Sequence, residues 1–265
     1  PTDVLAAVEN EFTELERELA CPAEQDQAYD QVVSKGELIS SLIVYHYLIS
    51  KYTACEWIDA RTYIRTDSSF REGKVDWART SSNIQLLKPV LSNKIIITQG
   101  FIGRTEDGLT TTLGREGSDF TAAIFGSSLD AESVTIWKDV AGVMNADPRR
   151  FPNAMVFAEL PFKEAAEMTY YGASVIHPKT IKPLANKSIP LLVKSFVDPS
   201  LPGTKIHECT VENLPPLIVL KENQCLISCK VTDYTFISEE QLSFIFSALL
   251  ELNVRINVMQ NSAIS

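Results

Sequence analysis

The chain has 265 residues, with 24 lysines and arginines against 34 aspartates and glutamates, so its formal net charge is −10. A hydrophobic content of 45% and a charged content of 22% are typical of a folded protein and exclude disordered and fibrous chains. The acidic balance disfavours a nucleic-acid or anionic-membrane surface, but permits an anionic small ligand in a local pocket of positive charge.

Membrane, zinc and disulfide classes are also disfavoured. The most apolar stretch, residues 38–49, is interrupted by polar side chains and is shorter than the roughly 20 apolar residues of a bilayer span. Residues 1–20 lack the basic start and apolar run of a signal peptide. The five cysteines are scattered and the three histidines have no zinc spacing. We therefore expect free thiols in a reducing cytoplasm and no protein metal site.

The first third of the chain is predicted to be mainly helical. Apolar spacing predicts a helix over residues 1–20 and a second, largely buried helix over 37–52. Strands are predicted at 55–60 and 62–65. A further helix is predicted over 76–91.

The next 100 residues alternate between strands and helices. Three short β-branched runs without polar alternation predict strands buried on both faces, at residues 94–99, 134–137 and 190–196. Helices are predicted between them, at residues 119–129, 162–171 and 178–187. This order predicts an α/β fold with a mainly parallel sheet, whose ligands lie at the carboxyl ends of the strands.

The pattern changes at the Asn-Leu-Pro-Pro segment, residues 213–216. Beyond it, strands are predicted at 217–220, 226–231 and 254–259, with a helix over 238–252. We expect two domains: an α/β domain over residues 1–212 and a smaller, incomplete α+β unit over 213–265.

The most informative segment runs from Gly100 to Asp119, where glycines and threonines follow a buried strand and lead into a helix. Glycines allow a ligand to approach the backbone, and a helix start presents amides to an anion. Arg115 can bind a carboxylate through two parallel hydrogen bonds, and Asp119 can receive an ammonium group. An ordinary loop with Ser118 as the helix N-cap explains the same residues.

A second polar segment leaves the predicted strand at 134–137. Lys138 and Arg149 bring positive charge to the rim of the sheet, and Asp139 can accept a hydrogen bond from a ribose or a base. A solvated loop with a turn at Asp147-Pro148 is the alternative.

Two further residues have ordinary structural explanations. A carboxylate in the first turn of a helix, as predicted for Glu37, more often complements the helix dipole than binds an ammonium group. His177 beside a proline is more often a packed or solvated loop histidine than a catalytic base. Neither a Walker nor a Rossmann glycine pattern occurs in the chain.

Together these segments, over roughly residues 33–205, resemble aspartate kinase of the amino-acid kinase superfamily. The resemblance implies a three-layer α/β/α sandwich with a mainly parallel sheet. The segments that carry it are Ser34 to Glu37, DARTYIRTD (59–67), TTTLGREGSDFTAA (110–123), DVAGVMNADPR (139–149) and GASVIHP (172–178).

The resemblance implies that ATP, with Mg²⁺, phosphorylates the side-chain carboxylate of L-aspartate to 4-phospho-L-aspartate, the first step toward lysine, threonine and methionine. It places Arg115 on a substrate carboxylate and Glu37 and Asp119 on the α-ammonium group. The same pocket would be lined by Phe101, Thr112 and Ser118. The implied nucleotide contacts are Lys138, Asp139, Met144, Arg149 and Ser174.

The chain departs from the family pattern in two places. The family begins with a Lys-Phe-Gly-Gly-Thr-Ser strand and loop, and nothing like it precedes Ser34. Lys138, Met144 and Ser174 stand where a hydroxyl, an aromatic ring and a lysine are frequent in the family. Lys138 or Lys179 is expected to supply the missing positive charge.

The segment from Leu217 resembles the start of an ACT regulatory domain, which in this family binds an end-product amino acid across a paired interface. The resemblance implies a homodimer or larger homo-oligomer and places Met259, Gln260 and Asn261 near the effector. Two other readings stay open: a binding and regulatory fragment without turnover, and a sibling kinase acting on glutamate, acetylglutamate or carbamate.

Overall fold

The computed structural model describes residues 2–20, 23–52, 54–172, 176–212, 214–230, 236–254 and 256–262. The chain forms two compact units, Pro1–Ile218 and Val219–Ser265. The first unit therefore extends six residues past the boundary predicted at 212. Among the described helices, none combines the length and the apolar character that a bilayer crossing needs.

The chain begins with two packed helices, α1 (Thr2–Leu19) and α2 (Gln25–Ile49). The helix predicted over 1–20 is confirmed, but α2 begins twelve residues before the predicted start at 37. The ammonium group of Lys35, whose side chain is 2% exposed, joins the helices through ion pairs with Glu11 at 3.1 Å and Glu14 at 2.8 Å. Burial disfavours the charged lysine, but these carboxylates outweigh it and raise the pKa of Lys35.

The segment after α2 contains a short strand, β1 (Cys55–Trp57), and a single helical turn, α3 (Ala60–Tyr63). The strand predicted at 62–65 is wrong, because the Asp59 carboxylate accepts a hydrogen bond from the Arg61 amide and starts α3. The helix predicted over 76–91 forms as two pieces, α4 (Trp77–Gln85) and α5 (Lys88–Leu91). The following strand, β2 (Ile95–Ile97), pairs in parallel with β1.

The segment after β2, which was expected to be a loop, forms a hairpin. Its strands are β3 (Ile102–Arg104) and β4 (Thr110–Thr112), which pair antiparallel and are largely buried. Helix α6 (Gly117–Leu129) begins five residues after β4 ends. The first part of the glycine- and threonine-rich segment therefore lies in the two strands of this hairpin, and its last part begins α6.

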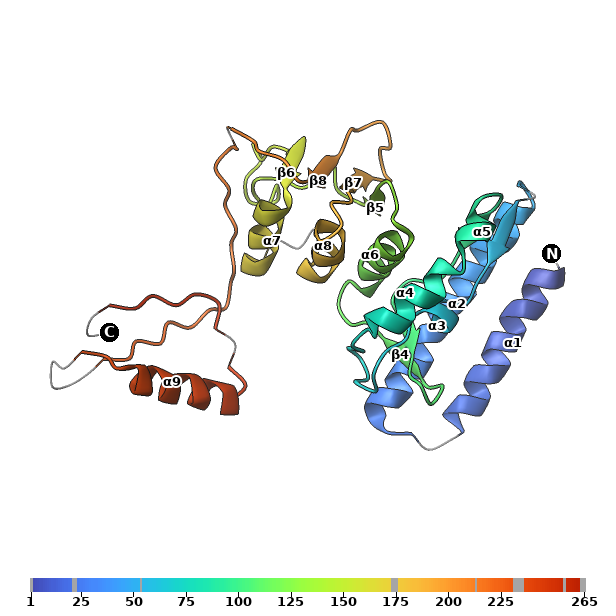
Figure 1. Cartoon of the computed structure of the whole chain (residues 1–265), viewed down its shortest axis with the longest axis horizontal. Coiled ribbons are helices and arrows are strands. Elements are labelled where there is room, and N and C mark those ends of the chain that lie inside the picture. Colours follow the sequence, from blue (N-terminus) through green and yellow to red (C-terminus); the bar gives the residue numbers. More distant parts are fainter. Residues whose placement is uncertain are drawn as a thin grey trace. The chain divides into compact units, whose positions relative to one another are not determined.

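A four-stranded sheet forms the other half of the first unit, in the order β5-β7-β8-β6. Helices α6, α7 and α8 lie side by side along one face of this sheet (Figure 1). Strands β5 and β7 pair in parallel, so their carboxyl ends share one edge. The bounds are β5 (Val134–Lys138), β6 (Glu159–Pro161), α7 (Phe162–Tyr171), α8 (Pro178–Ala185), β7 (Leu191–Ser195) and β8 (Thr204–His207).

The predicted α/β class with mainly parallel pairing is confirmed. Three of the described strand pairs are parallel and two are antiparallel, and the strands form three sheets rather than one. Helix α6 contributes to both apolar cores of the unit: Ala123 packs into the core of the four-stranded sheet, and Ile124 packs with α2 and the β3–β4 hairpin.

The second unit contains helix α9 (Glu239–Glu251), close to the predicted range of 238–252. Ser238 and Gln241 form a reciprocal capping box at its start. The three strands predicted at 217–220, 226–231 and 254–259 are wrong over their described residues, which form no strand ladder. No described residue after 218 is buried, so no apolar core holds extended segments together there.

Candidate functional site

The threonine strand of the predicted signature is held by a buried carboxylate. Asp30, in the second turn of α2, is fully buried and accepts hydrogen bonds from the Thr112 amide and hydroxyl, each at 2.8 Å. The Arg71 amide also donates a hydrogen bond to the Asp30 carboxylate, to Oδ2 at 2.8 Å. Thr111 beside it is joined to Thr66 by a 2.6 Å hydroxyl contact. The strand is therefore fixed by polar contacts inside the protein.

The backbone around the start of α6 adopts strained conformations. Phe101 and Glu116 have φ values of +70° and +55°, which cost a non-glycine residue roughly 1–3 kcal/mol. A side chain at Gly100 would meet the Ser118 backbone at 2.8 Å, so the two turns pack directly against each other. Strain of this kind is often found at ligand sites, and here it shapes the turns that carry the predicted aspartate contacts.

The alternative interpretation, an ordinary loop in which Ser118 is the N-cap of the helix, is wrong. Glu116 takes the N-cap position of α6 and its side chain makes no capping hydrogen bond, while Ser118 lies exposed in the first turn. The left-handed backbone of Glu116 starts the helix two residues earlier than a serine cap would. The first-turn amides of α6 consequently have no side-chain cap, which suits an anionic ligand.

Asp119 and Lys138 connect the two predicted half-sites. Asp119 lies in the first turn of α6, and Lys138 is the last residue of β5. The Lys138 ammonium group and the Asp119 carboxylate form an ion pair at 2.6 Å, with both side chains mostly buried. The start of α6 and the carboxyl end of β5 therefore meet at one place.

Arg115 and Glu37 differ in environment. Arg115 is exposed, and within the described part of the chain its guanidinium has no ion-pair partner. The prediction of Glu37 in a first helical turn is wrong, because Glu37 lies in the interior of α2, two turns after Asp30. Partial burial raises the pKa of the Glu37 carboxyl group. No ion pair joins Glu37, Arg115 and Asp119 among these described side chains.

The predicted nucleotide loop is anchored to the sheet. Gly142 has a φ of +152°, and a side chain there would meet the Thr204 hydroxyl at 2.6 Å. Met144 is half-buried, while Asp139 and Arg149 are exposed. The turn at Asp147-Pro148 forms as predicted, with the Arg149 amide donating to the Asp147 carboxylate. Ser174 lies outside the described residues.

His177 and Lys179 have structural partners. His177 is the N-cap of α8, and its Nδ1 accepts a hydrogen bond from the Lys179 amide at 3.1 Å. Burial, and then the positive charge of Lys179, lower the pKa of His177. The Lys179 ammonium group is paired with the Glu72 carboxylate. Of the two lysines expected to supply charge, Lys138 is the one that contacts a predicted site residue.

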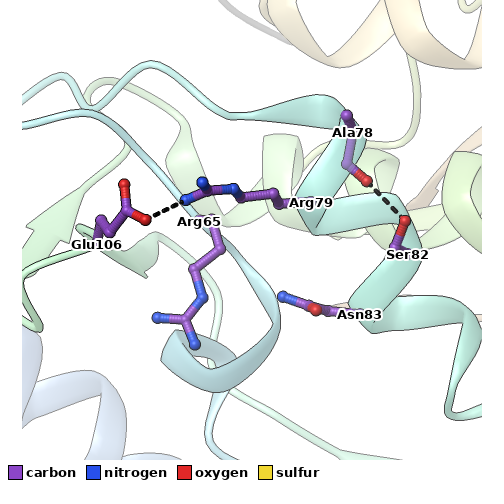
Figure 2. A pocket seen from close by; sticks show the side chains of 6 residues that line it. All are labelled: Arg65, Ala78, Arg79, Ser82, Asn83 and Glu106. Carbon is purple, nitrogen blue, oxygen red and sulfur yellow. Dashed lines mark hydrogen bonds and ion pairs between the residues drawn. The ribbon is translucent and has the colours of Figure 1, made fainter.

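The predicted effector contacts Met259, Gln260 and Asn261 are all exposed in the second unit. One surface cavity of about 550 Å³ lies in the first unit, between α4 and the β3–β4 turn. Figure 2 shows Arg79 paired with Glu106 across it, with Ser82 bonded to the Ala78 carbonyl. The cavity shares no residue with the predicted aspartate and nucleotide contacts.

Sequence reasoning missed Asp30 and the pairing of Lys138 with Asp119. No role was predicted for Asp30 because the second helix was predicted to begin at residue 37, after Asp30. Once α2 is extended, Asp30 and Glu37 are seven residues apart and lie on one helix face, which is the signal that could have found it. The ion pair depends on the packing of α6 against β5, which no local spacing reveals.

The profile of the amino acid kinase family matches residues 2–195. The chain belongs to this family. Lysine-sensitive aspartokinase 3 from Escherichia coli (strain K12) is 37% identical over 253 residues, which are 94% of this chain and 56% of that protein. A chloroplastic bifunctional aspartokinase/homoserine dehydrogenase 1 from Zea mays is 38% identical over 178 residues, 67% of this chain and 19% of that protein.

Solved structures of aspartokinases have the same fold. E. coli aspartokinase III in complex with aspartate and ADP (R-state) has a TM-score of 0.78 and 32% identity, covering 97% of this chain and 58% of that one. The same enzyme in complex with lysine and aspartate (T-state) has a TM-score of 0.76 and 31% identity, covering 100% of this chain and 60% of that one. The chain has the amino-acid kinase fold and spans little more than half the length of these relatives.

Asp30→Ala is expected to destabilise the first unit by about 3 kcal/mol or more, because two buried donors of Thr112 and the partly buried Arg71 amide would lose their acceptor. Asp26→Ala on the same helix is the control: Asp26 is exposed and its ion pair with Arg71 should contribute less than about 1 kcal/mol. Urea unfolding measures both free energies. Equal losses for the two variants would contradict the role of Asp30.

His177 is expected to make the stability depend on pH. Because its pKa is lowered in the folded chain, its stabilisation is present above the unfolded value of about 6.5 and is lost as the pH falls below it. Protonation of Nδ1 also removes the α8 cap. His177→Asn keeps a capping side chain without titrating, so it should lose less stability between pH 7.5 and 5.5. Equal losses of stability in the wild type and in His177→Asn would refute this role. The charged groups that act on His177 are Lys179, Glu116, Arg115 and Glu72.

Proposed function

We propose that the first unit transfers the γ-phosphoryl group of ATP to the side-chain carboxylate of L-aspartate, giving 4-phospho-L-aspartate. The observation that carries the proposal is the 2.6 Å ion pair between Asp119 and Lys138. It joins the segment expected to bind aspartate to the segment expected to bind nucleotide. The E. coli relative with 94% coverage of this chain is an aspartokinase, and one solved complex of E. coli aspartokinase III holds aspartate and ADP.

Aspartate is proposed to bind at the start of α6. Arg115 presents a guanidinium group that is not engaged elsewhere among the described residues, and two parallel hydrogen bonds to a carboxylate fit its geometry. Glu37 and Asp119 would receive the α-ammonium group, and Phe101, Thr112 and Ser118 would line the pocket. The uncapped amides of α6 add partial positive charge for a dicarboxylic substrate.

The nucleotide is proposed to bind at the carboxyl end of β5, against Lys138, Asp139, Met144, Arg149 and Ser174. Mg²⁺ commonly takes one or two carboxylates together with phosphate oxygens, and the exposed carboxylate of Asp139 beside Lys138 fits that donor set. When bound, the ion would neutralise phosphate charge. Lys138 would bind the phosphates, and the loop over residues 139–149 would bind the ribose or the base.

The chemistry requires alignment rather than a general base. The aspartate side chain is already ionised at neutral pH, so its carboxylate oxygen can attack the γ-phosphorus directly. A new phosphorus–oxygen bond forms, the bond to the β–γ bridging oxygen breaks, and ADP leaves with that electron pair. Lys138 would offset the charge on the transferred group after exchanging its ion pair with Asp119 for the phosphate, which would leave Asp119 to receive the α-ammonium group. Positioning would supply much of the remaining rate enhancement.

The second unit is proposed to bind an end-product amino acid through Met259, Gln260 and Asn261, in a homodimer or larger homo-oligomer. Its described residues are all at least partly exposed, with large apolar side chains such as Leu226 and Phe244 facing solvent. Lysine is the first effector to test, because the E. coli relative is lysine-sensitive.

Arg115→Ala is expected to reduce kcat/KM for aspartate by roughly 30- to 150-fold, equivalent to about 2–3 kcal/mol for a charged bidentate contact. The KM for ATP should change little. An ATP-dependent hydroxamate assay measures turnover, and isothermal titration measures aspartate binding separately. Arg17→Ala, an exposed arginine on α1, is the matched control. Undiminished use of aspartate by Arg115→Ala would reject the assignment, and preferential use of glutamate, acetylglutamate or carbamate would indicate a sibling kinase.

Lys138→Met is expected to lower kcat by about 10²- to 10³-fold, because it removes a cation from the transferring phosphate. Lys194→Met is the matched control, since Lys194 lies on the neighbouring strand β7 and its ammonium group stands 5.8 Å from the Trp137 ring. The same assay should find Lys194→Met close to wild type. An equal fall in kcat for both variants would show that Lys138 contributes to the structure of the sheet and not to phosphoryl transfer.

A further inference from the structure

Three possible metal ligands meet at the β6–β8 edge of the four-stranded sheet. Strands β6 and β8 pair in parallel, with Glu159 opposite Lys205 and Pro161 opposite His207. Side chains two residues apart on a strand point to the same face, so Glu159 and His207 share one face of the pair. The opposite face carries Leu160 and Ile206 into the core.

Cys209 follows His207 by two residues and lies beside it. The ligand atoms of Glu159, His207 and Cys209 are all within 4.8 Å of one another. His207 Nε2 and Glu159 Oε1 are 3.6 Å apart. His207 Nε2 is buried and has no hydrogen-bond partner among the described residues. A buried ring nitrogen without a partner costs free energy, which a bound cation would recover.

We propose that Glu159, His207 and Cys209 form a Zn²⁺ site with three protein ligands and one open position. A thiolate, an imidazole and a carboxylate are the ligand types of zinc, and a thiolate and an imidazole together disfavour Mg²⁺ and Ca²⁺. Ligand atoms on a tetrahedral zinc lie about 3.3–3.6 Å apart, given metal–ligand distances of about 2.0–2.3 Å. Glu159 and His207 are already at that separation.

Little movement is needed to complete the site. Glu159 is an exposed side chain and can change rotamer freely, and Cys209 lies just past the end of β8, outside the strand ladder. The site shares no residue with the proposed phosphoryl-transfer site. Its ion would fasten the edge strand β6 to β8, so we expect a structural role. The spacing of histidines and cysteines along the chain did not predict it, because strand pairing supplies Glu159 from 48 residues away.

Cobalt substitution tests the site in the full chain without nucleotide. Co²⁺ bound through Cys209 is expected to give visible d–d bands and a near-ultraviolet thiolate-to-metal charge-transfer band. These bands should saturate at one Co²⁺ per chain, and added Zn²⁺ should abolish them. Cys209→Ser should remove the charge-transfer band. His207→Ala and Cys209→Ser should weaken zinc binding by about 100-fold or more, and Glu159→Gln by less.

Cys225→Ser is the matched control, because Cys225 is an exposed free cysteine in the second unit. Its spectrum should equal that of the wild type. A missing charge-transfer band in the wild type, or a band that persists in Cys209→Ser, would overturn the proposal.

A measurement on the wild type alone covers the case in which a variant fails to fold. Zinc is expected to protect Cys209, but not Cys225, from alkylation by iodoacetamide, as read by peptide mass spectrometry. It should also raise the melting temperature in proportion to the logarithm of its free concentration once the site is saturated. Equal alkylation of Cys209 with and without zinc would contradict the site.

Discussion

The position of helix α6 determines the geometry of the proposed site. The helix is packed on two sides, with Ala123 in one apolar core and Ile124 in the other. Gly126 allows close contact with Val134 of β5, because a side chain there would meet the valine at 2.3 Å. A helix held in this way cannot shift along its axis without disrupting both cores. Its first turn, with Asp119, is therefore fixed beside Lys138 at the end of β5.

A buried polar layer supports the same region from the other side. Asp30 satisfies the amide and hydroxyl of Thr112, and the hydroxyls of Thr66 and Thr111 bond to each other in the interior. Such groups are costly to bury unless each one is paired, so the layer specifies one register for the β3–β4 hairpin. The strained turns at Phe101 and Glu116 are tolerated because the hairpin and α6 hold both of their ends.

The local patterns predicted much of the fold but little of the site. The β-branched runs predicted the strands at 95–97, 134–138 and 191–195 to within two residues at each end. The prediction that both faces are buried is wrong for the first two strands, because Ile95 is 58% and Trp137 50% exposed. Local rules failed where a tertiary contact or a cap decides the structure, as for Glu37, Ser118 and residues 62–65. They failed again in the second unit, where the described parts of the apolar runs have no core and form no strand ladder. The Asp119–Lys138 pair and the Glu159–His207–Cys209 cluster come from strand and helix packing, which single-sequence spacing cannot show.

The charge distribution reconciles an acidic chain with the anionic substrates proposed for it. Carboxylates outnumber cations by ten, and many lysines and arginines are engaged in ion pairs, as Lys35 and Lys179 are. Arg115 and Arg149 are different: both are exposed, and no described carboxylate forms an ion pair with either guanidinium. A cation already paired inside the protein must give up that partner to bind a ligand, whereas an unpaired one does not. The acidic exterior therefore disfavours extended polyanions, while these two guanidinium groups remain available to small ones.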